Sequence, residues 1–189
     1  MRFALLGLAL FTFSILQVLV PLTANGQEGE TSLEYQVKGA YLYNFAKFVD
    51  WPPQTFSSPT SPIILCTLGQ SPFGPEFENQ LREKKVRDRS LEIRRVTDAE
   101  EASSCQILFI PATEHAHIHE VIAELKGKSV LLVGETPGFD QQGGMIQFVV
   151  EGGTVRFKIS PLAAKQSGLQ ISSKLLQVAL QVVTTGGQE

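Results

Sequence analysis

Residues 143–160 carry a β-hairpin pattern that strongly limits how the chain can fold. Gly152 and Gly153 separate two apolar runs, and paired glycines suit a two-residue turn because both adopt positive φ easily. This turn predicts three facing apolar pairs: Val150 with Val155, Phe148 with Phe157, and Ile146 with Ile159. Side chains alternate along a strand, so all three pairs share one face. A shift by one residue would scatter that face, and we therefore predict this register and a hairpin that lies on a core.

The opposite face of the predicted hairpin is more polar. The same register sets Gln147 against Lys158 and Val149 against Arg156. We predict that Arg156 and Lys158 lie on this face, outside the core. Arg156 is therefore a candidate contact for a ligand or a partner.

The N-terminal residues 1–26 have the pattern of a secretory signal peptide. Arg2 precedes a long apolar run, and Ala24 and Gly26 place small residues at positions −3 and −1 of a cut before Gln27. The competing interpretation is an uncleaved anchor, because the run approaches the length that spans a bilayer. We predict a signal peptide over 1–26, export of the chain from the cytoplasm, and one domain over 27–189.

Export changes the interpretation of the two cysteines, Cys66 and Cys105. Cysteines in an oxidising compartment tend to be paired, so we predict a disulfide between them. The alternative is two unrelated buried thiols, since free cysteine is commonly buried.

Strand and helix patterns alternate along the rest of the chain. An aromatic and aliphatic stripe predicts a helix over 31–49, with Val37 facing inward and Lys38 at a more polar position. Apolar runs predict strands at 62–68, 90–96, 105–110 and 128–133, followed by the hairpin. Capping residues and helical periodicity predict further helices after Ser71, Thr113, Ser160 and Ser172, the last with Val183 inward.

This order of elements predicts an α/β fold. We expect a single three-layer domain with a mostly parallel sheet of about six strands, a C-terminal antiparallel hairpin and about five helices. The net charge of −3 and a hydrophobic content of 43% suit one globular domain and do not indicate a polyanionic partner such as nucleic acid.

Several functional classes are excluded by missing patterns. Gly69–Gly74 has the outer spacing of a phosphate loop but lacks the following Lys and Ser or Thr, and no G-x-G-x-x-G occurs. His119 is not followed by a histidine at the zincin spacing, and we expect no metal site. No nucleophile, base and acid set stands out, so we expect no cofactor and no catalytic activity.

Short blocks across the chain resemble the YfiR-like family. They are residues 40–52 (AYLYNFAKFVDWP), 105–110 (CQILFI), 138–139 (GF), 143–146 (GGMI), 155–157 (VRF), 163–164 (AA), 168–169 (GL) and 172–176 (SSKLL). The resemblance implies a periplasmic α/β protein without catalysis. Its best understood members repress a membrane-bound diguanylate cyclase through that enzyme's periplasmic sensor domain, which lowers cyclic-di-GMP and biofilm formation. Some relatives carry a second cysteine pair near the Gly-Phe block, which this chain lacks.

The resemblance leaves the partner and the mode of action open. It implies the periplasmic domain of an inner-membrane diguanylate cyclase as partner, with an outer-membrane lipoprotein and a homodimer as further candidates. A small-ligand-binding module is the main alternative, with a candidate aromatic pocket near Tyr43, Trp51 and Phe139. An enzyme with an unrecognised site is the remaining class.

Overall fold

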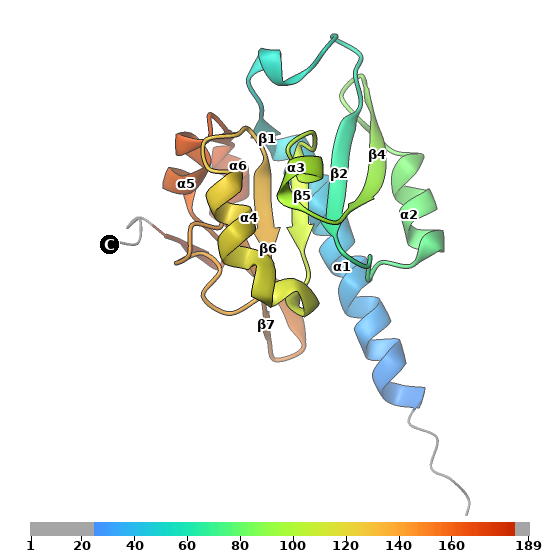
Figure 1. Ribbon diagram of the computed structural model, residues 1–189. Coiled ribbons are helices and arrows are strands. Elements are labelled where there is room, and N and C mark those ends of the chain that lie inside the picture. The colour runs from blue at the N-terminus through green and yellow to red at the C-terminus, as the bar shows by residue number, and fades with distance from the viewer. Residues whose placement is uncertain (1–24, 184–189) are drawn as a thin grey trace, which may run out of the picture.

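A computed structural model describes residues 25–183, with side chains from residue 33 onward, and shows one mixed α/β domain (Figure 1). The main sheet has eight strands in the order β10-β8-β7-β6-β5-β2-β4-β3. Their bounds are β2 (Ile63–Leu68), β3 (Lys85–Val86), β4 (Arg89–Val96), β5 (Ile107–Ile110), β6 (Leu131–Gly134), β7 (Ile146–Glu151), β8 (Thr154–Ile159) and β10 (Gln181–Val182). The neighbours from β4 to β7 pair in parallel, as predicted.

Helices cover both faces of this sheet. Figure 1 shows α1 behind the sheet and α3 and α4 in front of it. The helices are α1 (Asn25–Phe48), α2 (Pro75–Arg82), α3 (Ala99–Ala102), α4 (Ile118–Glu124), α5 (Pro161–Gln166) and α6 (Ser173–Val178), with 3-10 turns at η1 (Pro53–Thr55) and η2 (Ala112–His117). The predicted three-layer class is therefore confirmed.

The hairpin of β7 and β8 has the predicted register. Ile146 pairs with Ile159, Phe148 with Phe157, and Val150 with Val155, while Gln147 faces Lys158 and Val149 faces Arg156. Gly152 and Gly153 both have positive φ, at 56° and 75°. Near the tip of the hairpin the apolar face extends beyond the core, and Val150 is accordingly 49% exposed.

Aromatic rings join α1 to that apolar face. Phe45 is fully buried and packs on Phe148 and Phe157, with ring centroids 5.8 and 5.1 Å apart. Tyr41 lies one turn earlier and also meets Phe157, at 5.1 Å. Burial of large aromatic surfaces of this kind is the main source of stability in such a core.

A disulfide joins Cys66, within β2, to Cys105, just before the neighbouring strand β5. Their Cα atoms are 6.0 Å apart and both side chains are buried. The predicted pairing is present in the structure, and among the described residues there is no free cysteine.

The structure corrects several predicted boundaries. Four two-residue strands were missed: β3, β10, and the separate antiparallel pair β1 (Val49–Asp50) and β9 (Gln170–Ile171). The last helix ends at Val178 because the chain turns extended at Ala179 and then pairs with β8, so Val183 lies beyond the helix. Strands this short show no periodicity, which is why the sequence did not reveal them.

The first helix differs from its prediction in extent and orientation. It begins at Asn25, six residues before the predicted start. Val37 is 37% exposed, whereas Lys38, predicted at a more polar position, is only 3% exposed. The predicted signal peptide lies outside the described residues apart from Asn25 and Gly26, which open α1.

Candidate functional site

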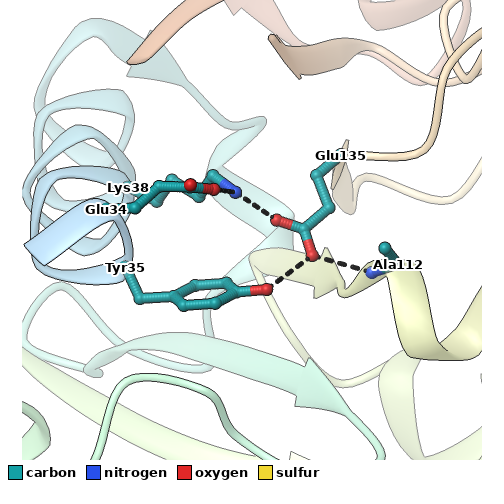
Figure 2. Close-up of polar contacts among 5 residues, drawn as sticks. All are labelled: Glu34, Tyr35, Lys38, Ala112 and Glu135. Carbon is teal, nitrogen blue, oxygen red and sulfur yellow. Dashed lines mark hydrogen bonds and ion pairs between the residues drawn. The ribbon is translucent and has the colours of Figure 1, made fainter. Parts of the chain in front are cut away.

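A buried polar cluster lies where α1 crosses the carboxyl end of β6 (Figure 2). Glu135 directly follows β6 and stands at the centre of the cluster. Its Oε1 accepts hydrogen bonds from the Tyr35 hydroxyl at 3.0 Å and from the backbone N–H of Ala112 at 2.7 Å. Its Oε2 accepts a hydrogen bond from Lys38 Nζ at 2.5 Å, and Lys38 also pairs with Glu34 one turn earlier on α1. One carboxylate therefore ties α1, β6 and the start of η2 together.

Burial makes the charges of this cluster energetically important. The side chains of Lys38 and Glu135 are only 4% and 6% exposed, whereas that of Glu34 is 34% exposed. A buried charge is tolerated when it is paired and hydrogen-bonded, and both conditions hold for the Lys38–Glu135 pair. With Glu34 the cluster contains two carboxylates and one ammonium group. The extra negative charge lies on the more exposed side of the cluster, at Glu34.

Tyr35 is held in its neutral form by the same surroundings. Burial raises the pKa of its phenol well above the usual value, and the negative charge of Glu135 and the hydrogen bond to it raise it further. Lys38 Nζ also lies 4.6 Å from the centre of the Tyr35 ring. The neutral hydroxyl can therefore remain a hydrogen-bond donor to Glu135 at physiological pH.

A cavity of about 560 Å³ opens beside the cluster. Glu34, Tyr35 and Lys38 line it from α1, while Phe148 and Val150 line it from β7. Clefts of this size, with apolar walls and a few polar groups, are typical of ligand sites. The cavity also lies at the carboxyl ends of parallel strands, where open α/β sheets commonly bind ligands.

Two of the residues singled out in the sequence lie at the other end of the sheet. The indole N–H of Trp51 donates to the carbonyl of Gln106, at 3.1 Å, just before β5 begins. The Tyr43 hydroxyl donates to the carbonyl of Lys85, at 3.0 Å. Both side chains thus connect α1 and the segment after it to the sheet.

The other two residues lie elsewhere, so the four do not form one pocket. Phe139 is fully buried, and its ring packs directly on Gly134 and Gly144. A Cβ atom added to Gly134 would lie 2.8 Å from this ring, and one added to Gly144 would lie 2.2 Å from it. Arg156 is exposed on β8, as its position in the hairpin predicted. The proposed aromatic pocket therefore does not assemble, because Phe139 follows β6 whereas Trp51 lies near the start of β5.

The polar cluster was missed in the sequence, although two signals for it exist. Glu34 and Lys38 have the i, i+4 spacing of a helical ion pair. Glu135 directly follows an apolar strand, a place where functional side chains of parallel sheets often lie. Neither signal shows that the two segments meet, since they are about a hundred residues apart.

Two kinds of site are not found in the part of the chain that the structure describes. Within residues 25–183 no helix has both the length and the apolar character needed to span a membrane. Nor do His, Cys, Asp or Glu side chains gather there in groups of three or more that could hold a metal ion.

The sequence model of a known family matches residues 35–180, which is most of the chain and includes the polar cluster except Glu34. The chain belongs to the YfiR/HmsC-like family. At family level this supports a periplasmic regulator of diguanylate cyclase, from a family that is regulatory and not catalytic.

Solved structures show only a distant likeness. A conserved domain protein from Vibrio cholerae O1 biovar El Tor strain N16961 aligns with a TM-score of 0.48 and 11% identity, over 79% of this chain and 60% of that one. An ABC domain from Streptococcus pneumoniae, solved in complex with L-Trp, aligns with a TM-score of 0.43 and 15% identity, over 66% and 56%. The chain thus spans less than two thirds of each of these proteins. No curated protein is a significant match.

Proposed function

We propose that this protein is exported to the periplasm and represses an inner-membrane diguanylate cyclase by binding the periplasmic sensor region of that enzyme. Cyclic-di-GMP and biofilm formation fall as a result. The observation that carries the proposal is membership of the YfiR/HmsC-like family over residues 35–180. An outer-membrane lipoprotein and a second copy of the chain are the further partners to be considered.

Two features of the molecule support this proposal. The disulfide between Cys66 and Cys105 suits an oxidising compartment. Large aliphatic side chains are exposed near the first and last helices and are available for apolar contacts with a partner: Leu33 at 62%, Val178 at 65% and Val182 at 37%. Apolar anchors of this kind carry much of the energy of a protein interface.

A soluble repressor acts by binding the inactive form of its partner more tightly than the active form. A hundredfold suppression needs a difference of about 2.7 kcal/mol between the two affinities, since each tenfold step corresponds to about 1.4 kcal/mol. A small interface with a few buried apolar anchors can supply a difference of this size.

The test compares three strains: a deletion, the deletion with the exported protein restored, and the deletion with a version that lacks residues 1–26. We expect high cyclic-di-GMP in the deletion, low levels with the exported protein, and high levels with the version that stays in the cytoplasm. Equal cyclic-di-GMP in all three strains would refute the proposal.

A small-ligand-binding module is the second candidate function, because the 560 Å³ cavity beside Glu135 has the size of a ligand site. A ligand that binds only the native state raises the unfolding midpoint. A thermal-shift screen against small aromatic metabolites measures this directly. A hit whose effect disappears in a Tyr35→Ala variant would assign the ligand to this cavity.

A further inference from the structure

The strand β7 extends beyond its neighbour β6 at the cavity. Pairing between the two ends at Gly134 and Gln147, although β7 continues to Glu151. On its other edge β7 stays paired with β8 as far as Glu151 and Thr154. In Figure 1 the hairpin accordingly projects past the rest of the sheet. Among the described residues, no strand covers this last part of the β7 edge.

Main-chain groups point out from the uncovered edge. The Ser160 N–H donates to the carbonyl of Met145, so that carbonyl points toward β8. Carbonyl direction alternates along a strand, and the carbonyls of Phe148 and Val150 therefore point away from β8, as does the N–H of Val150. Both residues line the 560 Å³ cavity. Unpaired strand edges of this kind can accept another strand.

Charges lie on either side of the open edge. Glu34, 34% exposed, lines the cavity on the side of α1, toward which Phe148 also points. Lys158 lines the cavity too, but it faces Gln147 and therefore belongs to the opposite side of the sheet. Within residues 33–183 no carboxylate forms an ion pair with Lys158.

We propose that the open edge of β7 captures an extended segment of a partner protein as an added strand. Main-chain hydrogen bonds to Phe148 and Val150 would hold the segment, as in other cases of strand addition. Neighbouring side chains of a strand point to opposite faces. A partner segment that fits this edge thus has two adjacent charged residues, a basic one that faces Glu34 and an acidic one that faces Lys158. β-Branched residues lie on either side of these two. This proposal rests on the proposed function in one respect only, namely the identity of the protein that supplies the segment.

The test uses the protein purified from the periplasm and a defined probe, the hexapeptide acetyl-Thr-Val-Lys-Glu-Val-Thr-amide. The matched control peptide is acetyl-Thr-Pro-Lys-Glu-Pro-Thr-amide, which has the same charges but cannot pair as a strand. Hydrogen exchange of the Val150 amide, followed by NMR, reports whether its N–H becomes bonded. We expect the first peptide to slow this exchange at least about tenfold and the control peptide to leave it unchanged.

Two variants of Val150 make the test specific. Val150→Pro removes the N–H that points away from β8 and leaves the hydrogen bonds to β8 in place. Val150 is already half exposed, so the change of side chain removes little buried surface. Val150→Thr keeps the N–H and the β-branched shape. We expect the first variant to bind the probe about tenfold more weakly, as the loss of one buried hydrogen bond implies, and the second to bind like the wild type. Circular dichroism checks that both are folded.

Three results would overturn the proposal: unchanged Val150 exchange with the strand-forming peptide, equal affinity of Val150→Pro, or slowed exchange on concentrating the protein alone. The last result would assign the edge to a second copy of the chain. Failure of the proposed function appears separately, as unchanged cyclic-di-GMP in the deletion strain, so the two failures are distinguishable.

Discussion

Lys38 is buried in the structure, although lysine is a residue type that is rarely buried. Its long aliphatic stem allows it to lie on an apolar helix face while its ammonium group reaches Glu135. Glu135 depends on this contact, because without Lys38 its buried carboxylate would have no positive charge beside it, whereas Lys38 also pairs with Glu34.

We therefore predict that Lys38→Met lowers the free energy of unfolding by about 3–5 kcal/mol, since it removes one partner of a buried ion pair and leaves the buried Glu135 side chain without it. Urea unfolding at pH 7 measures this loss. Lys47→Met serves as the control, because Lys47 is exposed on the same helix and its removal should change stability by less than about 0.5 kcal/mol. Adding Glu135→Gln to Lys38→Met should recover part of the loss, and a Lys38→Met protein as stable as wild type would contradict the buried pair.

The ionisation of Tyr35 makes the stability of the protein depend on pH. Its pKa is raised in the folded state, first by burial and then by Glu135. Folding therefore favours the protonated phenol, and this stabilisation is complete below the unfolded pKa of about 10 and is lost as the pH rises above it. We expect the stability difference between wild type and Tyr35→Phe to be constant from pH 7 to 9 and to shrink at higher pH. Parallel stability curves up to pH 11 would show that the phenol is not perturbed.

At the scale of elements, the disulfide joins the strand β2 to the segment that leads into β5. Its two cysteines are 39 residues apart, and the link restricts the unfolded chain between them. We predict that Cys105→Ser lowers the free energy of unfolding by about 2–4 kcal/mol. Mass spectrometry of unreduced peptides from the periplasmic protein should show the cross-link, and two free thiols there would contradict it.

The hairpin is the element on which α1 rests. Phe157 is 1% exposed and its ring meets those of Phe45 and Tyr41. We predict that Phe157→Ala costs about 3–5 kcal/mol of stability because it leaves a large cavity under the helix. The neighbouring Arg156→Ala is the matched control, since Arg156 is exposed on the other face and its loss should be nearly neutral. Equal stability of the two variants in urea would show that the register is wrong.

In the molecule as a whole, two exposed apolar regions are candidates for the surface that would meet the cyclase if the proposed function holds. Leu33 lies on α1, which supplies one wall of the cavity at the open edge of β7, and Val178 ends α6. The two are similarly exposed, at 62% and 65%. We predict that Leu33→Asp raises cyclic-di-GMP in the complemented strain toward the deletion level, while Val178→Asp leaves repression intact. Both variants should unfold like wild type, and the reverse pattern of repression would place the interface at α6.

Elements with a local and regular pattern could be predicted from the amino-acid sequence. Alternating apolar residues and two glycines were enough for the hairpin register, because a turn of fixed length leaves one pairing that buries the apolar face. Strand and helix alternation was likewise enough for the parallel sheet, and two cysteines together with the predicted signal peptide were enough to predict the disulfide.

The contacts between distant segments could not be predicted from the sequence and are seen in the folded chain. The contact between Lys38 and Glu135 joins residues 97 positions apart, and no local pattern encodes such a pairing. The open edge of β7 likewise follows from where β6 ends relative to its neighbour, which is a property of the assembled sheet. Phe139 is the converse case, because the sequence made it a candidate for an aromatic pocket, whereas packing against Gly134 and Gly144 buries it completely. Burial and long-range pairing depend on how the layers stack, and that is settled when the whole core forms.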